Sequence, residues 1–266
     1  MQWRLVAVLA ILLGGACSEH PVSEAPGVAP SPLSPSTPPS PSTRHLRATR
    51  FLAFGDSLTA GDTSDGTTLH VDPAATYPAY LQALLTERAG TQSITVMNDG
   101  VVGETAAQGA LRLPGQLAAR RPDVLLLLEG INDIHGSVGP SGIPPAIAAL
   151  RTMIQDARGV GAGVIIGTLL PARPGALKPG TVDLIAPFNG ELIPMAQQEG
   201  AIVVDLHTSF LKDMPDWIGP DGLHPTSAGY REMAQLFLDA ITANFEAASS
   251  SASGGGGIMT PRGIRK

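Results

Sequence analysis

The sequence predicts a doubly wound α/β sandwich, and two patterns carry this prediction. Between residues 50 and 245, short apolar runs of strand length alternate with longer segments of helical periodicity. The short runs are continuously apolar rather than alternating, which is typical of parallel strands that are covered on both faces. Together these patterns indicate one sheet of about five parallel strands with helices on either side.

The apolar runs and the periodic segments define the expected elements in chain order. Strands are predicted at residues 50–54, 94–98, 123–129, 163–169 and 201–206. Helices are predicted at residues 77–88, 105–120, 144–158, 182–199 and 226–245. In the last helix, Tyr230, Met233 and Phe237 recur at spacings of three to four residues, which gives that helix one apolar face.

Residues 1–17 have the organisation of a secretory signal peptide. Arg4 supplies an early positive charge, and the apolar stretch after it is too short to span a bilayer. The only cysteine, Cys17, follows a small-residue patch, so no intramolecular disulfide can form. Its position resembles the lipobox of bacterial lipoproteins, although Gly14 stands where that family usually has leucine. The resemblance implies a lipid anchor at Cys17, whereas ordinary signal cleavage would leave this cysteine incidental.

The remaining segments divide the chain into a tether, one domain and a tail. Residues 18–48 are rich in Pro and Ser and are expected to form a disordered tether. Residues 49–247 are expected to form the domain, and residues 248–266 a flexible Ser/Gly-rich tail. The net charge of −6 and the scattered basic residues argue against nucleic-acid binding. The expected location is the bacterial cell envelope. Ser18 after the cysteine gives no Asp-type inner-membrane retention signal and favours the outer membrane.

Polar and glycine residues follow the first three predicted strands. Ser57 ends the segment FLAFGDS, Gly100 and Gly103 lie in the loop after the second strand, and Asn132 follows the third. Ligands of open α/β sheets bind beyond the carboxyl ends of the strands, where these loops would meet. A serine there can act as a nucleophile, and backbone N–H groups or an amide can stabilise an oxyanion. Each residue taken alone is better explained as part of an ordinary turn, so only their combination points to a site.

A carboxylate and an imidazole lie three residues apart in the loop before the last helix. Asp221 can reach His224 across the turn in GPDGLHP, and such a pair can activate a serine hydroxyl. His135 follows the Asn132 loop but has no comparable acid partner. The sequence contains no GxSxG motif, which argues against the α/β-hydrolase arrangement. It also contains no HExxH, paired CxxC or GxxxxGK[ST] motif, which argues against a zincin site, a thiolate metal site and a P-loop.

Four blocks, GDS, GxxG, GxND and DxxHP, occur in this order at predicted strand ends, and the chain at this point resembles the SGNH (GDSL) hydrolase superfamily. The resemblance covers residues 50–245 and implies a flavodoxin-like three-layer α/β/α fold. It implies ester hydrolysis with no metal or organic cofactor. It also implies that Ser57 is the nucleophile, His224 the base and Asp221 the residue that orients the base. The implied oxyanion hole is the Ser57 N–H, the Gly103 N–H and the Asn132 side chain.

Within the superfamily, the stretches FGDSLTAG, RLPGQL and LLLLEGIND resemble the bacterial arylesterase, thioesterase and lysophospholipase group. That resemblance implies a small acyl-ester, thioester or lysophospholipid substrate. The segment 62–78 is longer than is usual in the family and lies next to the nucleophile, so it leaves the acyl-chain preference open. Two alternatives remain: a carbohydrate O-acetylesterase acting on envelope or environmental glycans, and a non-catalytic tethered binding protein. The oligomeric state is not defined by the sequence, which is compatible with a monomer.

Overall fold

A computed structural model describes residues 45–135, 138–174 and 181–247 of the chain. The predicted signal peptide with Cys17, most of the predicted tether and the predicted tail lie outside these described residues. Within the described residues, none of the helices combines the length and the apolar character that a membrane crossing requires.

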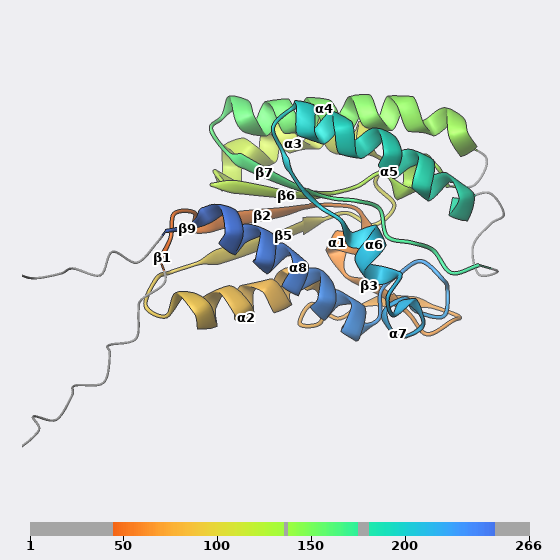
Figure 1. The fold of residues 1–266 in the computed structure, drawn as a ribbon, viewed down its shortest axis with the longest axis horizontal. Coiled ribbons are helices and arrows are strands. Elements are labelled where there is room, and N and C mark those ends of the chain that lie inside the picture. The colour runs from red at the N-terminus through yellow and green to blue at the C-terminus, as the bar shows by residue number, and fades with distance from the viewer. Residues whose placement is uncertain (1–44, 136–137, 175–180, 248–266) are drawn as a thin grey trace, which may run out of the picture. The chain divides into compact units, whose positions relative to one another are not determined.

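The centre of the domain is a parallel sheet of five strands in the order β5-β2-β6-β7-β8 (Figure 1). All four pairings in this sheet are parallel. The strands are β2 (Arg50–Gly55), β5 (Thr95–Gly100), β6 (Val124–Leu128), β7 (Gly163–Gly167) and β8 (Ile202–Val204). These strands correspond to the five predicted apolar runs, so the predicted sheet is confirmed.

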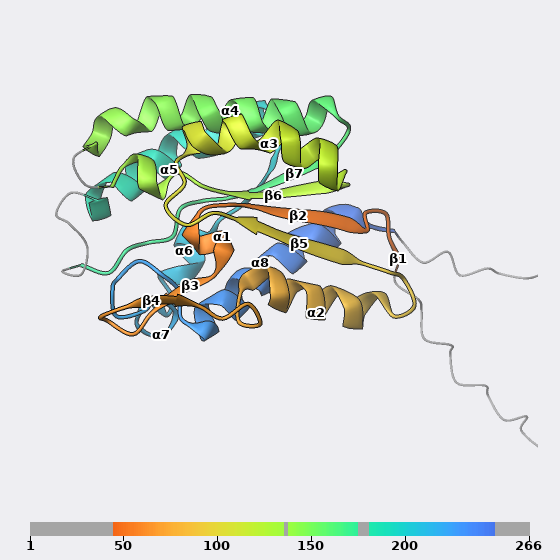
Figure 2. The same cartoon turned by 180° about the vertical axis from the view of Figure 1, so that it is seen from behind.

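Helices cover both faces of the sheet, which gives the three-layer α/β/α architecture that the sequence predicts (Figures 1 and 2). One face carries α2 (Tyr77–Ala89) and α8 (Ser227–Phe245). The other face carries α3 (Ala106–Arg120), α4 (Ile143–Gly159) and α5 (Thr181–Gln198). The rings of Tyr77 and Phe237 stack with their centroids 5.0 Å apart, which joins the two helices of the first face.

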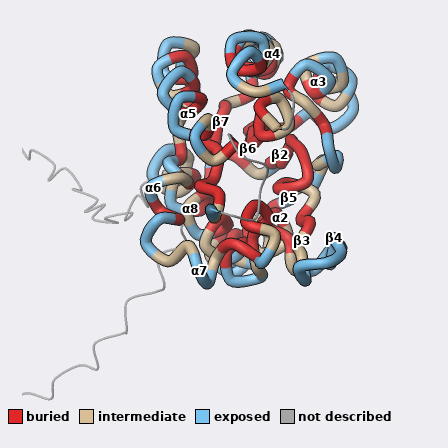
Figure 3. The backbone as a smooth tube through the Cα atoms, turned by 90° about the vertical axis from the view of Figure 1, so that its right-hand side faces the viewer, coloured by how far each residue is buried: buried red, intermediate tan, exposed pale blue. Residues whose placement is uncertain are grey.

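The core lies along the central strands and the inward faces of the helices, as the burial colours of Figure 3 show. All five residues of β6 are buried, and Phe51 to Phe54 of β2 have no exposed surface. Burial of such a side chain contributes about 1.5–3 kcal/mol. The two-sided burial explains why these strands are continuous apolar runs rather than alternating ones.

The domain begins slightly earlier than the sequence indicates. Residues 45–48, assigned to the tether, contain strand β1 (His45–Leu46), which pairs antiparallel with β9 (Glu246–Ala247). Leu46 and Ala48 are buried in the core. The composition around residue 45 could not reveal this strand, because its partner lies about 200 residues away in the chain.

Several short elements complete the fold. A hairpin of β3 (Asp62–Ser64) and β4 (Leu69–Val71) occupies the segment that the sequence leaves as a long loop. Single helical turns are α1 (Ser57–Ala60), α6 (Leu206–Phe210) and α7 (Met214–Trp217). Two 3-10 turns lie between β6 and α4, at Ile131–Asp133 and Gly139–Gly142. The first 3-10 turn and α1 lie at the carboxyl ends of β6 and β2, where the candidate site is built.

Candidate active site

Ser57 is the first residue of α1, and the two residues before it shape the turn out of β2. Gly55 has φ +157°, and a Cβ atom there would lie 1.9 Å from the carbonyl oxygen of Leu128. Asp56 caps the helix, because its Oδ1 accepts a hydrogen bond from the N–H of Leu58 at 2.9 Å. Complete burial raises the pKa of Asp56 to about 7. The GDS segment is therefore a tight strand-to-helix turn that presents Ser57 at the sheet edge.

His224 and Asp221 reach this serine from the loop before α8. The Ser57 Oγ lies 3.0 Å from the His224 Nε2, and the His224 Nδ1 lies 2.6 Å from the Asp221 Oδ2. The other carboxylate oxygen of Asp221 accepts hydrogen bonds from the backbone N–H groups of Leu223 and His224, each at 3.1 Å. This arrangement favours the tautomer in which Nδ1 carries the proton and Nε2 accepts from the serine hydroxyl.

The Asp221 carboxylate is electrostatically suited to hold that tautomer. Its partial burial opposes ionisation, but the hydrogen bonds from His224 and from the backbone outweigh burial and hold the pKa of Asp221 below its ordinary value. Asp221 is therefore ionised at neutral pH, and it can stabilise a positive charge on the imidazole of His224.

Gly103 and Asn132 lie in neighbouring loops beside the serine. Gly103 has φ +77°, a left-handed conformation that favours glycine. The Asn132 Nδ2 donates to the carbonyl oxygen of Glu104 at 2.8 Å, which leaves its second amide hydrogen for another acceptor. The neighbouring Asp133 accepts from the N–H of Ala106 at 2.9 Å, so the turn after β6 is bonded to the start of α3.

One cavity of about 210 Å³ brings most of these groups together. It is lined by Ser57, Asp62, Leu69, Val102, Gly103, Asn132, His135, Leu223 and His224. Asp221 contacts His224 from outside the lining. The sequence places the segment 62–78 next to the nucleophile but does not single out Asp62 and Leu69 within it. Nor does it indicate Val102 and Leu223, because the positions of all four follow from the β3–β4 hairpin and the loop geometry. The arrangement places a hydroxyl, an imidazole and hydrogen-bond donors around one space.

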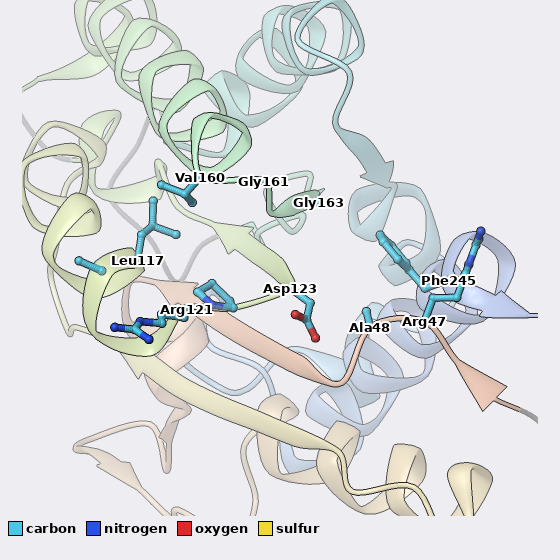
Figure 4. A pocket seen from close by; sticks show the side chains of 11 residues that line it. Arg47, Ala48, Leu117, Arg121, Asp123, Val160, Gly161, Gly163 and Phe245 are labelled. Atoms are coloured by element: carbon cyan, nitrogen blue, oxygen red, sulfur yellow. The ribbon is translucent and has the colours of Figure 1, made fainter.

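A larger hollow lies at the opposite edge of the sheet, at the amino ends of the strands (Figure 4). Its volume is about 660 Å³, and Arg121, Asp123, Val160 and Phe245 are among its lining residues. No serine, cysteine or histidine is among them. The part of the chain that the structure describes also contains no group of three or more His, Cys, Asp or Glu side chains able to hold a metal ion. The hollow therefore lacks the pair of hydroxyl and imidazole groups that lines the smaller cavity.

Comparisons with known proteins find esterases among the relatives of this chain. The chain is 28% identical over 177 residues to an arylesterase of Vibrio mimicus, covering 65% of this chain and 78% of that protein. It is 28% identical over 213 residues to an acetylxylan esterase of Xylanibacter ruminicola, covering 70% of this chain but 42% of that protein. A lipase/acylhydrolase from Enterococcus faecalis superposes with a TM-score of 0.62 at 22% identity, over 74% of this chain and 97% of that one, and shows the shared fold.

The family model of the GDSL-like Lipase/Acylhydrolase family matches residues 53–232, which contain both Ser57 and His224. This match takes in every strand of the central sheet from β2 onwards in part or in full. The chain therefore belongs to the GDSL-like lipase/acylhydrolase family and is a carboxylic ester hydrolase.

Proposed function

We propose that the protein hydrolyses small acyl esters through an acyl-enzyme formed on Ser57. The observation that carries this proposal is the continuous chain of contacts from the Ser57 hydroxyl through His224 to Asp221, at 3.0 and 2.6 Å. Both distances lie within hydrogen-bond range, and the first allows His224 to take the serine proton directly. His224 is the proposed base, and Asp221 is the proposed residue that orients it.

The proposed cycle has two acyl-transfer steps. As the Ser57 Oγ attacks the ester carbonyl carbon, its proton passes to the Nε2 of His224. The tetrahedral intermediate collapses when His224 returns this proton to the leaving alcohol, and the acyl group remains on the serine. Water then attacks the acyl-enzyme with His224 again as base, which releases the acid and restores the hydroxyl.

Three groups are proposed to stabilise the oxyanion of both intermediates: the backbone N–H groups of Ser57 and Gly103 and the side-chain amide of Asn132. Their support is that all three residues line the same small cavity. The bond from Asn132 to the Glu104 carbonyl fixes the orientation of the amide before substrate binds. Donors that need no reorganisation during the reaction supply the largest single part of such catalysis.

The cavity supports a short apolar acyl group as the preferred substrate part. Leu69, Val102 and Leu223 supply its apolar surface, and they share its volume of about 210 Å³ with the polar groups of Ser57, Asn132 and His224, which limits the apolar space for the acyl chain. Leu69 and Val102 are 51% and 58% exposed, so a longer chain could continue over the rim rather than into the domain. Thioesters and lysophospholipids share the reacting carbonyl and belong to the same proposal.

A second candidate is a carbohydrate O-acetylesterase, which the likeness to an acetylxylan esterase favours. An acetyl group would fit the same cavity. The lining residues include no Phe, Tyr or Trp on which a sugar ring could stack. We therefore place simple acyl esters first.

A hydrolysis profile tests this order. Rates are measured on p-nitrophenyl esters from acetyl to palmitoyl and on acetylated xylan, for the wild type and for Ser57→Ala. We expect the fastest hydrolysis with acetyl to butyryl esters, a loss of activity in the variant, and labelling of the wild type alone by a fluorophosphonate probe. Acetate release from xylan without activity on other esters would select the second candidate. An unlabelled, inactive wild type would support the non-catalytic alternative.

We also propose export and lipid anchoring at Cys17, supported by the signal-peptide pattern of residues 1–17 and the lipobox-like position of the cysteine. Labelling of cells with a radioactive fatty acid tests this proposal. The wild type is expected to carry the label in the membrane fraction, and Cys17→Ala to lose it. Equal labelling of both proteins would contradict lipidation at this residue.

A further inference from the structure

Glu104 lies between two of the groups assigned to the oxyanion hole. It directly follows Gly103, and its carbonyl oxygen accepts the hydrogen bond from the Asn132 amide at 2.8 Å. It also precedes Thr105, the residue that caps α3 with a reciprocal bond to Gln108. A movement of Glu104 would therefore shift the Gly103 N–H and the acceptor that orients Asn132 together.

The side chain of Glu104 is held by Arg112 from α3. The Arg112 Nε donates to the Glu104 Oε1 at 2.8 Å, and the Nη2 donates to the Oε2 at 2.5 Å. This two-point geometry fixes the carboxylate in direction as well as distance. Glu104 itself is 6% exposed, so the pair is largely shielded from water.

Arg112 is anchored in turn by two strands. Its Nη2 donates to the carbonyl oxygen of Asp99 at 3.0 Å, and its Nη1 lies 3.0 Å from the Asp99 carboxylate at the end of β5. Its guanidinium carbon lies 3.9 Å from the centre of the Phe54 ring in β2. The arginine thus ties the loop of Gly103 to β2, which leads into the serine turn, and to its neighbour β5.

Glu129 completes the surroundings of this ion pair. It follows β6, is 2% exposed, and approaches α3 so closely that a Cβ at Gly109 would lie 2.3 Å from its Oε2. Burial, with the neighbouring charges of Asp56 and Glu104, raises the pKa of Glu129 to about 10. A neutral Glu129 leaves the guanidinium to Glu104 instead of competing for it.

We propose that the Arg112–Glu104 ion pair is the positioning element of the oxyanion hole, holding the Gly103 N–H and the acceptor of the Asn132 amide in the geometry that the transition state needs. This inference rests on the proposed function of Ser57 and Asn132. Neither Arg112 nor Glu104 lines the cavity, so both act through the donors rather than on the substrate. A small displacement of such donors lowers the rate, because catalysis depends on their alignment with the developing charge.

Double-mutant kinetics with p-nitrophenyl acetate test the proposal. The variants are Arg112→Lys, which keeps the charge but loses the two-point geometry, and Glu104→Gln, which keeps the side-chain size and the backbone carbonyl. Each is made in the wild type and in Asn132→Ala. The matched control is Arg88→Lys, because Arg88 of α2 makes a comparable pair with Glu246 of β9 at 2.6 Å, and neither residue lines the candidate cavity. Circular dichroism and thermal melting check that each variant is folded.

We expect Arg112→Lys and Glu104→Gln each to lower kcat roughly tenfold or more with KM nearly unchanged, and Arg88→Lys to leave kcat unchanged. In the Asn132→Ala background this loss should be smaller, because one of the two donors that the pair positions is already gone and only the Gly103 N–H remains to be displaced. Equal losses in both backgrounds, or folded variants with wild-type kcat, would overturn the positioning role while leaving the proposed triad intact. Full activity of Asn132→Ala alone would instead overturn the assigned oxyanion hole.

Discussion

Replacement of Asp221 by asparagine is the sharpest perturbation of the proposed mechanism, because the local hydrogen bonds decide how the new amide must lie. The Asp221 Oδ1 accepts from two backbone N–H groups, those of Leu223 and His224, at 3.1 Å each. An amide NH2 cannot occupy that position, since it would face two donors. In Asp221→Asn the carbonyl oxygen must therefore take the Oδ1 place, and the NH2 must face the His224 ring.

This orientation reverses the tautomer of the histidine. The Nδ1, which lies 2.6 Å from the Asp221 Oδ2 in the wild type, would have to accept a hydrogen bond. The ring proton then moves to Nε2, the atom that faces the Ser57 Oγ at 3.0 Å. A protonated Nε2 cannot take the serine proton, so we expect kcat/KM to fall by ~10⁴, or about 5 kcal/mol of transition-state stabilisation.

The assay is initial-rate hydrolysis of p-nitrophenyl acetate at neutral pH by the wild type, Asp221→Asn, Asp221→Ala and the surface control Asp216→Asn. The asparagine variant should keep the wild-type melting temperature within a few degrees, because it preserves the shape and the two backbone bonds. It should nevertheless be no more active than the alanine variant, which forces no tautomer. If Asp221→Asn retained more than about a tenth of the wild-type kcat/KM, the reasoning from tautomer to rate would be refuted.

Three further predictions concern other parts of the site. Asn132→Ala is expected to lower kcat on p-nitrophenyl acetate by roughly a hundredfold with an unchanged circular dichroism spectrum, and full activity would contradict its role. Leu69→Ala is expected to lower kcat/KM about tenfold for the butyryl ester but not for the acetyl ester, and equal changes for both esters would remove this leucine from the acyl site. The pKa of Glu129 is raised from 4.5 to about 10 among Asp56, Glu104 and Arg112, so ionisation of Glu129 should cost the wild type stability progressively as pH rises through this window. The melting temperature of Glu129→Gln minus that of the wild type should therefore increase by at least ~3 °C from pH 5 to pH 9. A difference that stays constant over this range would contradict the raised pKa.

The central layers of the fold could be predicted because their residues report burial directly. Strand β6 is apolar at every position and buried at every position, and the predicted helix at 105–120 differs from α3 by one residue at its start. The β3–β4 hairpin gave no such signal, because its residues are polar or exposed and its pairing is made by the backbone. The two-residue pairing of β1 with β9 joins opposite ends of the domain, which no local pattern can reveal.

Some residues of the candidate site could likewise be predicted from the sequence, and others could not. Ser57, Asn132 and His224 could be selected because each follows a predicted strand or precedes the last helix, whereas the choice of Gly103 over Gly100 depended on the family resemblance of the VGET stretch. All four residues line one cavity. The link between Glu104 and Arg112 could not, since their spacing of eight residues spans a loop and two helical turns. The wall contributed by Leu69 depends on the hairpin, and it was therefore equally hidden from the sequence.

The order of the strands explains why the proposed nucleophile and its oxyanion donors come from distant segments. Strand β2 lies between β5 and β6 in the sheet. Neighbouring strands are about 4.8 Å apart, so the loops after β5 and β6 stand on either side of the turn that carries Ser57. Gly103 comes from the first of these loops and Asn132 from the second, while His224 approaches from the loop before α8. A nucleophile on an edge strand would have a neighbouring loop on one side only, so the interior position of β2 is what allows the proposed donors to stand on both sides of one reacting carbon.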